Sequence, residues 1–204
     1  IEGGLATVSR GELTVETPSG IRRVQIDSRE GRAPVYRVDM GAPRFKAKEI
    51  PMIVEPGEGR PLLDIICDYP VEVSERRLLV TCLSLGNPHA VTFLEEPVEA
   101  FPLFELGPLV ENHPIFPNRV NFEVANVLAR EKVRARVWER GVGETLSCGT
   151  GACAIAVAAR LHGHVGGHVD IILPGGTLTV DWDGVGEVML SGPAELVFWG
   201  HWPD

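Results

Sequence analysis

The 204-residue sequence has little cysteine, few aromatic side chains and no long hydrophobic run. Its four cysteines include no CxxC pair and do not form the dense framework of a small disulfide-stabilised protein, and the sequence has no Asn-x-Ser/Thr site. No apolar run approaches the roughly 18 residues that a membrane helix needs. We therefore expect a reduced, cytoplasmic protein with no membrane partner.

Basic residues are also few. Lys and Arg number 19 against 28 Asp and Glu, which gives a net charge of −9. This balance argues against a protein that wraps nucleic acid or lies on anionic lipid, because both need a positive surface. A small-molecule partner is expected instead, and a local basic pocket remains compatible with the net charge.

Short alternating or β-branched runs, separated by Gly, Pro and Asp, predict a protein made mainly of strands. The predicted strands are residues 12–17, 21–26, 35–38, 62–67, 78–85, 90–94, 120–128, 132–138, 168–173, 178–182, 187–190 and 195–198. Two helices are predicted, a short one over 103–111, interrupted by Gly107 and Pro108, and a longer one over 150–162.

The longer helix, TGACAIAVAARLH, is apolar almost all the way round, whereas a surface helix has a polar face. We expect it to be buried and to end at Gly163, a residue suited to a C-terminal cap. Many short strands with one buried helix predict the α+β class, with a strongly curved sheet around that helix.

Cys148 stands in Ser-Cys-Gly-Thr-Gly, where the apolar helix is predicted to start. A helix N-terminus favours the thiolate, which predicts a lowered thiol pKa. Gly149 and Gly151 let the backbone come close to a ligand, and the N–H groups of Gly149 and Thr150 suit a carboxylate. The alternative is that Cys148 is an ordinary small core residue, but the flanking glycines favour a functional role.

Glu139 and Arg140 end the predicted strand that precedes this loop. The Arg140 guanidinium could bind a substrate carboxylate, and Glu139 could take an amino group or tune the thiol. A solvated strand end explains the same two residues without any function.

Three further polar residues lie in or next to predicted strands. Asn87 and His89 share one turn, which Asn-Pro explains without function, although the imidazole is titratable. Asn121 sits among strand formers, where Asn is uncommon, so it serves either a polar ligand or a structural hydrogen bond. The histidines 162, 164 and 168 lie in a glycine-rich segment at the end of the helix, and we expect no carboxylate or thiol partner nearby and therefore no metal site.

Five segments resemble the diaminopimelate epimerase family, in the same order and over nearly the whole chain. They are GNPHAVTF, FPNRVNFE, WERGVGETLSCGTGACA, LPGGTLTVDW and SGPAELVFWG. The resemblance implies two pseudo-symmetric domains, each a curved, mostly antiparallel sheet around a central helix. It assigns residues 40–190 to a complete second domain, and residues 1–39 with 191–204 to the first.

The resemblance also implies an activity, the interconversion of LL- and meso-diaminopimelate on the route to lysine and bacterial peptidoglycan. It implies no cofactor and no metal, and it makes a homodimer plausible. In this family two cysteines face each other across the α-carbon, one removing a proton as thiolate and the other donating one as thiol. Cys148 matches the second-domain cysteine, and His89 matches a residue that tunes the thiols together with Glu139.

The remaining matches concern substrate binding. Three positions match residues that hold the distal amino-acid head, namely Asn87, Asn121 and Arg140. The resemblance places Glu139 beside the reacting centre, and it implies that Gly149 and Thr150 bind the substrate α-carboxylate. The family's first cysteine lies in a CGNG-like loop, which the 204 residues do not contain, so we expect half of an active site here.

Two other functions fit the same residues. One is a thiol hydrolase with Cys148 as nucleophile, His89 as base and Glu139 as orienting group, which predicts a covalent acyl-enzyme. The other is a non-catalytic fragment that binds a carboxylate at the helix start.

Overall fold

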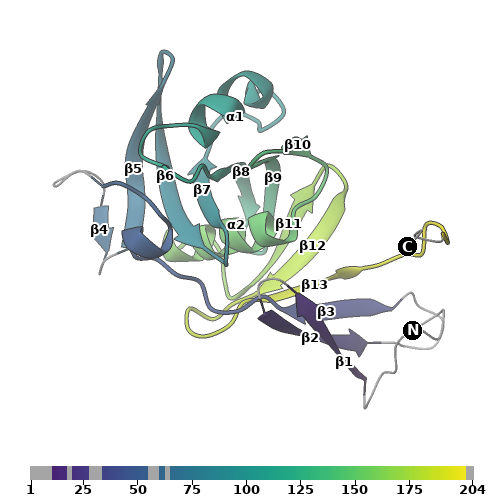
Figure 1. Ribbon diagram of the computed structural model, residues 1–204. Helices are drawn as coiled ribbons and strands as arrows, with labels where there is room; N and C mark the ends of the chain where they lie inside the picture. The colour runs from purple at the N-terminus through teal and green to yellow at the C-terminus, as the bar shows by residue number, and fades with distance from the viewer. Residues whose placement is uncertain (1–10, 18–19, 28–33, 55–59, 63–64, 201–204) are drawn as a thin grey trace.

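Strands dominate the structure, as the alternating pattern predicts (Figure 1). The computed structural model describes residues 11–17, 20–27, 34–54, 60–62 and 65–200. In chain order the strands are β1 (Glu12–Thr17), β2 (Gly20–Asp27), β3 (Val35–Asp39), β4 (Arg60–Leu62), β5 (Ile65–Val73), β6 (Arg76–Ser84), β7 (Pro88–Phe93), β8 (Asn121–Ala129), β9 (Lys132–Glu139), β10 (Gly143–Thr145), β11 (His168–Leu173), β12 (Gly176–Asp181) and β13 (Met189–Pro193). The helical elements are the short 3₁₀ turn η1 (Ala47–Glu49), α1 (Leu103–Glu111) and α2 (Gly149–Leu161).

The described strands form one sheet in the order β1-β2-β3-β13-β12-β11-β9-β8-β7-β6-β5-β4, with β10 added to β9. Only β7 with β8 and β9 with β11 pair in parallel among these strands; the other pairs are antiparallel. The sheet curves around α2, as Figure 1 shows. The predicted α+β class and mostly antiparallel sheet are confirmed.

The helix α2 is buried as its composition predicts, because every residue from Gly151 to Ala159 is buried. Five of these residues are alanines within two helix turns of Cys153, so the surrounding strands can approach closely. The helix ends in a Schellman motif, in which Gly163 has a φ of +73° and His164 N–H donates to the Ala159 carbonyl at 2.9 Å. The predicted glycine cap is therefore confirmed.

The helix α1 has the predicted bounds, 103–111, but it continues through Gly107 and Pro108 without the predicted interruption. Gly107 faces the Trp138 indole, and a Cβ at this position would lie 2.5 Å from the indole Cδ2. The glycine that looked like a helix breaker is required by close packing.

Replacing Gly107 with Ala should therefore destabilise the protein by about 1–2 kcal/mol, because overpacking outweighs the better helix propensity of alanine. Urea denaturation followed by circular dichroism measures this change. Gly166→Ala is the matched control, since nothing lies within 4 Å of a Cβ there. Equal stability of the two variants would contradict the packing argument.

Other differences concern the edges of the sheet. The predicted strand 195–198 is wrong: the described structure gives it no partner strand, and Val197 and Phe198 are 87% and 80% exposed. The predicted strand 62–67 is two strands, β4 and β5, although residues 63–64 lie outside the described part. The sequence pattern also missed the three-residue strand β10.

Two hydrophobic clusters pack on opposite faces of β8 and β9. Phe122 and Trp138 belong to the cluster beneath α1, whereas Ala125 and Val137 belong to the cluster around α2. Successive strand residues face opposite sides. Glu123 alternates with Ala125 in β8, and Glu139 alternates with Val137 in β9, so both acidic residues are on the α2 face.

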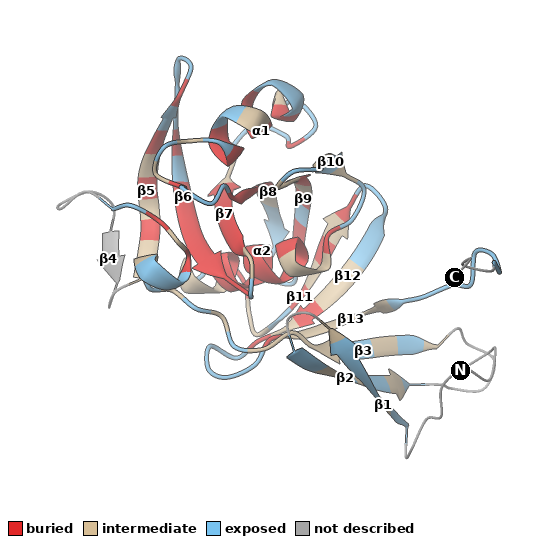
Figure 2. Cartoon of the chain, in the orientation of Figure 1, coloured by how far each residue is buried: buried red, intermediate tan, exposed pale blue. Residues whose placement is uncertain are grey.

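Burial is concentrated around α2 and its neighbouring strands, shown red in Figure 2. The strands β1, β2 and β3 lie apart from this core and contain no buried residue among those described. They join the rest through pairing of β3 with β13. No helix in the described ranges is long and apolar enough to cross a membrane.

Candidate active site

Cys148 is the N-cap residue of α2, as the sequence predicts. Its backbone is extended, with φ −137° and ψ 116°, and its Sγ accepts a hydrogen bond from the Gly151 N–H at 3.4 Å. The Thr150 hydroxyl lies 3.6 Å from the same sulfur. Cys148 as a residue is 7% exposed, so it is almost enclosed at the start of the buried helix.

The predicted lowering of the thiol pKa is wrong. Burial contributes most to a rise in the pKa of Cys148 to about 11, and the negative charge of Glu123 adds to the rise when that carboxyl is ionised. The hydrogen bonds from Thr150 and Gly151 lower the pKa, as expected at a helix start, but they do not offset burial. The thiol form therefore predominates at neutral pH, and its thiolate is a strong base.

His89 is completely buried and lies between two polar side chains on the α2 face of the sheet. Its Nδ1 is 2.6 Å from Glu123 Oε1, and its Nε2 is 3.1 Å from Asn87 Oδ1. The amide nitrogen of Asn87 donates to Thr150 Oγ1 at 3.1 Å. The structure thus brings Asn87, His89 and Thr150 together next to Cys148.

Glu123 is a site residue that the sequence interpretation missed. It is completely buried, and its Oε2 is the only buried side-chain N or O without a hydrogen-bond partner in the described structure. Burial raises its pKa above the ordinary value, while the contact with His89 offsets part of the rise and Glu139 adds to it. The available signal was a glutamate within the apolar run Asn-Phe-Glu-Val-Ala.

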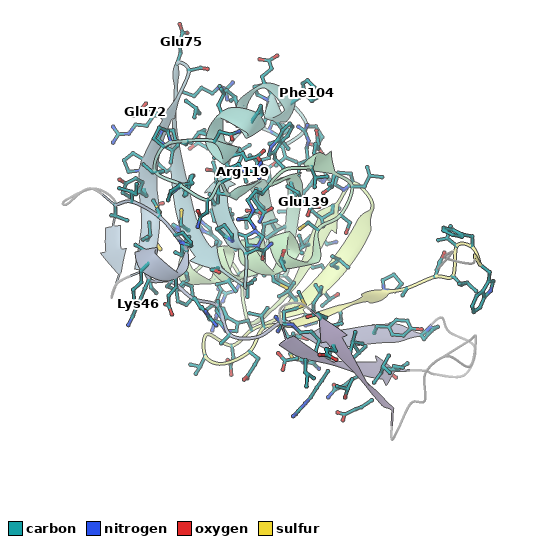
Figure 3. All side chains as sticks on the ribbon, viewed as in Figure 1. Lys46, Glu72, Glu75, Phe104, Arg119 and Glu139 are labelled. Atoms are coloured by element: carbon teal, nitrogen blue, oxygen red, sulfur yellow. The ribbon has the colours of Figure 1, made fainter. Side chains whose placement is uncertain are left out.

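The strand end with Glu139 and Arg140 lies on the same side of the site. Glu139 Oε1 accepts a hydrogen bond from the Thr145 hydroxyl at 2.7 Å, and Figure 3 shows Glu139 between α1 and α2. The Arg140 guanidinium donates to the Asn118 carbonyl at 3.0 Å. Both side chains are partly exposed, so either can reach a ligand.

Asn121 makes structural hydrogen bonds, which was one of the two roles expected for this residue. Its Nδ2 donates to the Pro88 carbonyl at 2.8 Å, and its Oδ1 accepts from the Arg140 N–H at 2.9 Å. The amide thereby ties the start of β7 to the end of β9. The side-chain amide has two N–H donors and two oxygen lone pairs, and the two hydrogen bonds use one of each. One N–H and one lone pair therefore remain for a ligand.

The arrangement does not support the thiol hydrolase. A nucleophile and its base must be within hydrogen-bond reach, but His89 bonds Glu123 and Asn87 whereas Cys148 bonds Thr150 and Gly151. Nothing in the described ranges groups three or more metal-ligating side chains. The expectation that no carboxylate lies near the three histidines is wrong for two of them. His168 Nδ1 is 2.6 Å from Asp181 Oδ1, and His162 Nε2 is 3.9 Å from Asp68 Oδ1.

The thiol chemistry predicts selective alkylation. Iodoacetamide should modify Cys148 faster than Cys82 and Cys153. Burial raises the thiol pKa of these two residues further than that of Cys148, and neither has any exposed surface. The rate at Cys148 should keep rising above pH 9 and level off only above about pH 11. Mass mapping of the labelled peptides measures this, with Cys148→Ala as the control. A plateau below pH 9 would contradict the raised pKa.

Solved structures with the same fold are racemases, epimerases and related proteins. A hydroxyproline epimerase from Agrobacterium vitis, with bound trans-4-hydroxy-L-proline, matches at a TM-score of 0.63 and 19% identity, over 94% of this chain and 59% of that one. A PhzF-family phenazine biosynthesis protein from Bacillus anthracis matches at 0.59 and 15% identity, over 94% and 68%. At these identities the likeness shows the fold alone.

Sequence comparison is more specific. The diaminopimelate epimerase family model matches residues 81–197. Diaminopimelate epimerase of Moorella thermoacetica is 47% identical over 94% of this chain and 66% of its own length, and that of Pelotomaculum thermopropionicum is 42% identical over 99% and 69%. The chain thus spans about two thirds of the length of these relatives. A match of this extent to the family model and to both relatives places the chain in the diaminopimelate epimerase family.

Proposed function

We propose that the protein containing this chain interconverts LL- and meso-diaminopimelate by proton transfer at the α-carbon, without a cofactor, and that Cys148 is one of its two acid–base groups. The observation that supports this most is the Cys148 thiol at the N-terminus of the buried helix α2. The first N–H groups of a helix have no intrahelical acceptor, so those of Gly149 and Thr150 suit the substrate α-carboxylate.

The reaction follows from these groups. The Cys148 thiolate takes the α-proton, so the C–H bond breaks, an S–H bond forms and the electron pair stays on carbon. The N–H groups at the helix start stabilise the charge that spreads onto the carboxylate. A thiol on the opposite face then donates a proton to carbon. The family resemblance gives that role to the cysteine of the CGNG-like loop.

The proposal assigns the other site residues as follows. Arg140, Asn121 and Asn87 hold the distal amino-acid head, and Glu139 binds beside the reacting centre. His89, whose Nε2 contacts Asn87 Oδ1, tunes the acid–base properties of the Cys148 thiol. The partial exposure of Arg140 and Glu139 and the spare capacity of the Asn121 amide are compatible with these roles.

We also propose that residues 40–190 form the second domain, and that residues 1–39 and 191–204 belong to the first. Support comes from the two hydrophobic clusters, all of whose members fall between Met40 and Leu190. Residues 1–10 and 201–204 lie outside the described part. By family resemblance we propose a cytoplasmic homodimer that serves lysine and peptidoglycan synthesis.

Deuterium incorporation from D₂O into LL-diaminopimelate tests the function, with product stereochemistry read in parallel. Deuterated meso product would mean that two acid–base groups act, and deuterated LL-diaminopimelate would mean that Cys148 acts alone. Equal exchange by the wild-type chain and Cys148→Ser would contradict the assignment. A carboxylate-binding fragment would show no exchange and would keep its affinity in Cys148→Ala.

A further inference from the structure

Four consecutive side-chain contacts connect the buried Glu123 carboxyl to the Cys148 sulfur. Glu123 Oε1 lies 2.6 Å from His89 Nδ1, and His89 Nε2 lies 3.1 Å from Asn87 Oδ1. Asn87 Nδ2 lies 3.1 Å from Thr150 Oγ1, which is 3.6 Å from Cys148 Sγ. This series of contacts begins in β8, passes through β7 and the turn that precedes it, and ends at the start of α2.

The chemistry of the central links fixes the direction of each bond. A carbonyl oxygen only accepts, so Asn87 Oδ1 requires the proton of His89 on Nε2. The Asn87 NH₂ group only donates, so it occupies a lone pair of Thr150 Oγ1. The Thr150 hydroxyl hydrogen is then available to the sulfur, where it stabilises a thiolate.

The first link requires a donor at Glu123. With its proton on Nε2, a neutral His89 presents a lone pair at Nδ1, which a protonated carboxyl can fill. The Ala90 backbone N–H lowers the pKa of Glu123, but burial acts in the opposite direction and is the largest influence. Among the described residues, Oε2 of Glu123 has no hydrogen-bond partner, which supports the protonated form, because an ionised carboxylate that is completely buried needs partners for both oxygens. The other titratable groups that interact electrostatically with Glu123 or Cys148 are Glu139, Cys82 and Cys153.

We propose that Glu123 is a positioning residue that stays protonated and, through His89 and Asn87, holds the Thr150 hydroxyl as a donor to the Cys148 sulfur. This proposal rests on the proposed function only in taking Cys148 as the acid–base thiol. Without the Glu123 donor, His89 can carry its proton on Nδ1, the Asn87 amide can turn over, and the Thr150 hydroxyl then donates to Asn87 instead of to sulfur. Glu123 thus acts on the thiolate without touching substrate.

The test is the rate of Cys148 alkylation by iodoacetamide, which needs no substrate and no second cysteine. Loss of the hydroxyl bond should raise the thiol pKa by about one unit, which lowers the thiolate fraction tenfold. Each remaining thiolate reacts about threefold faster, so the net rate at about pH 8.5 falls about threefold. Glu123→Leu and Thr150→Val should both show this fall, whereas Glu123→Gln, which keeps a neutral donor, should stay within about twofold of wild type.

Two comparisons separate this effect from general damage. Glu123→Leu combined with Thr150→Val should react no more slowly than Thr150→Val alone, because the last link is already absent. Thr92→Val, which removes a hydroxyl bonded to the Leu79 carbonyl on the same strand as His89, should leave the rate unchanged. Thermal unfolding of each variant confirms that it is folded. Faster alkylation in Glu123→Gln would show an ionised carboxylate and overturn the proposal, as would an unchanged rate in Glu123→Leu.

Discussion

Cys148→Ser should reduce epimerisation of diaminopimelate by at least about 10³-fold in a protein that contains this chain and the second acid–base group, because general acid–base groups each contribute about 10²–10⁴-fold. Serine is close to cysteine in size and is a favoured N-cap residue, so α2 should keep its start. The melting temperature should therefore stay within a few degrees of wild type while turnover is lost. A coupled assay of meso-diaminopimelate formation and thermal unfolding measure the two effects.

Cys153→Ala is the matched control. Cys153 lies in the same helix, is completely buried and packs in the core, so its replacement removes a thiol without touching the site. It should keep epimerase activity at a modest cost in stability. Near-normal turnover in Cys148→Ser would remove Cys148 from the acid–base role, and loss of turnover in both variants would point to packing.

Glu111→Ala should destabilise the protein by about 3 kcal/mol, because it leaves the buried Trp138 N–H and two partly buried donors, from Gly141 and Arg119, without their acceptor. The Glu111 carboxylate, 5% exposed at the end of α1, accepts hydrogen bonds from Trp138 Nε1 at 2.7 Å and the Gly141 N–H at 2.8 Å. It also binds Arg119 at 3.1 Å. A fall in melting temperature of about 10 °C is expected for a protein of this size.

The control for this variant is Glu105→Ala, on the exposed face of the same helix. Its effect should stay within about 0.5 kcal/mol. Because Gly141 follows Glu139 and Arg140 in the turn after β9, Glu111→Ala should also weaken substrate binding and raise KM. Equal stability of the two variants would show that the Glu111 contacts contribute little.

The sequence predicted the regular elements well because each has a local cause. The alternation in 12–17 and 168–173 gives β1 and β11 with the predicted bounds, and the apolar helix with Gly163 behind it gives α2. The failures come from tertiary contacts. Gly107 reads as a helix breaker until the Trp138 indole is placed against it, and 195–198 reads as a strand although it lacks a partner in the described part.

The site was only partly predictable for the same reason. The glycines around Cys148 identified the helix start, and the polar turn identified His89, because both are local signals. Glu123 was not identified, since its importance depends on the pairing of β7 with β8, which sets it against His89. The thiol pKa was predicted in the wrong direction because the sequence shows the helix start but not the burial around it.

The continuous burial of α2 has a kinetic consequence. Amide hydrogens from Ala152 to Ala159 can exchange with solvent only when the strands around them separate, so their exchange should report global unfolding of the protein. Cys148 is held at the end of this most protected segment and not on a loop that opens by itself. Access to the thiol by substrate must then come from movement of whatever covers the helix start, while the sulfur keeps its position.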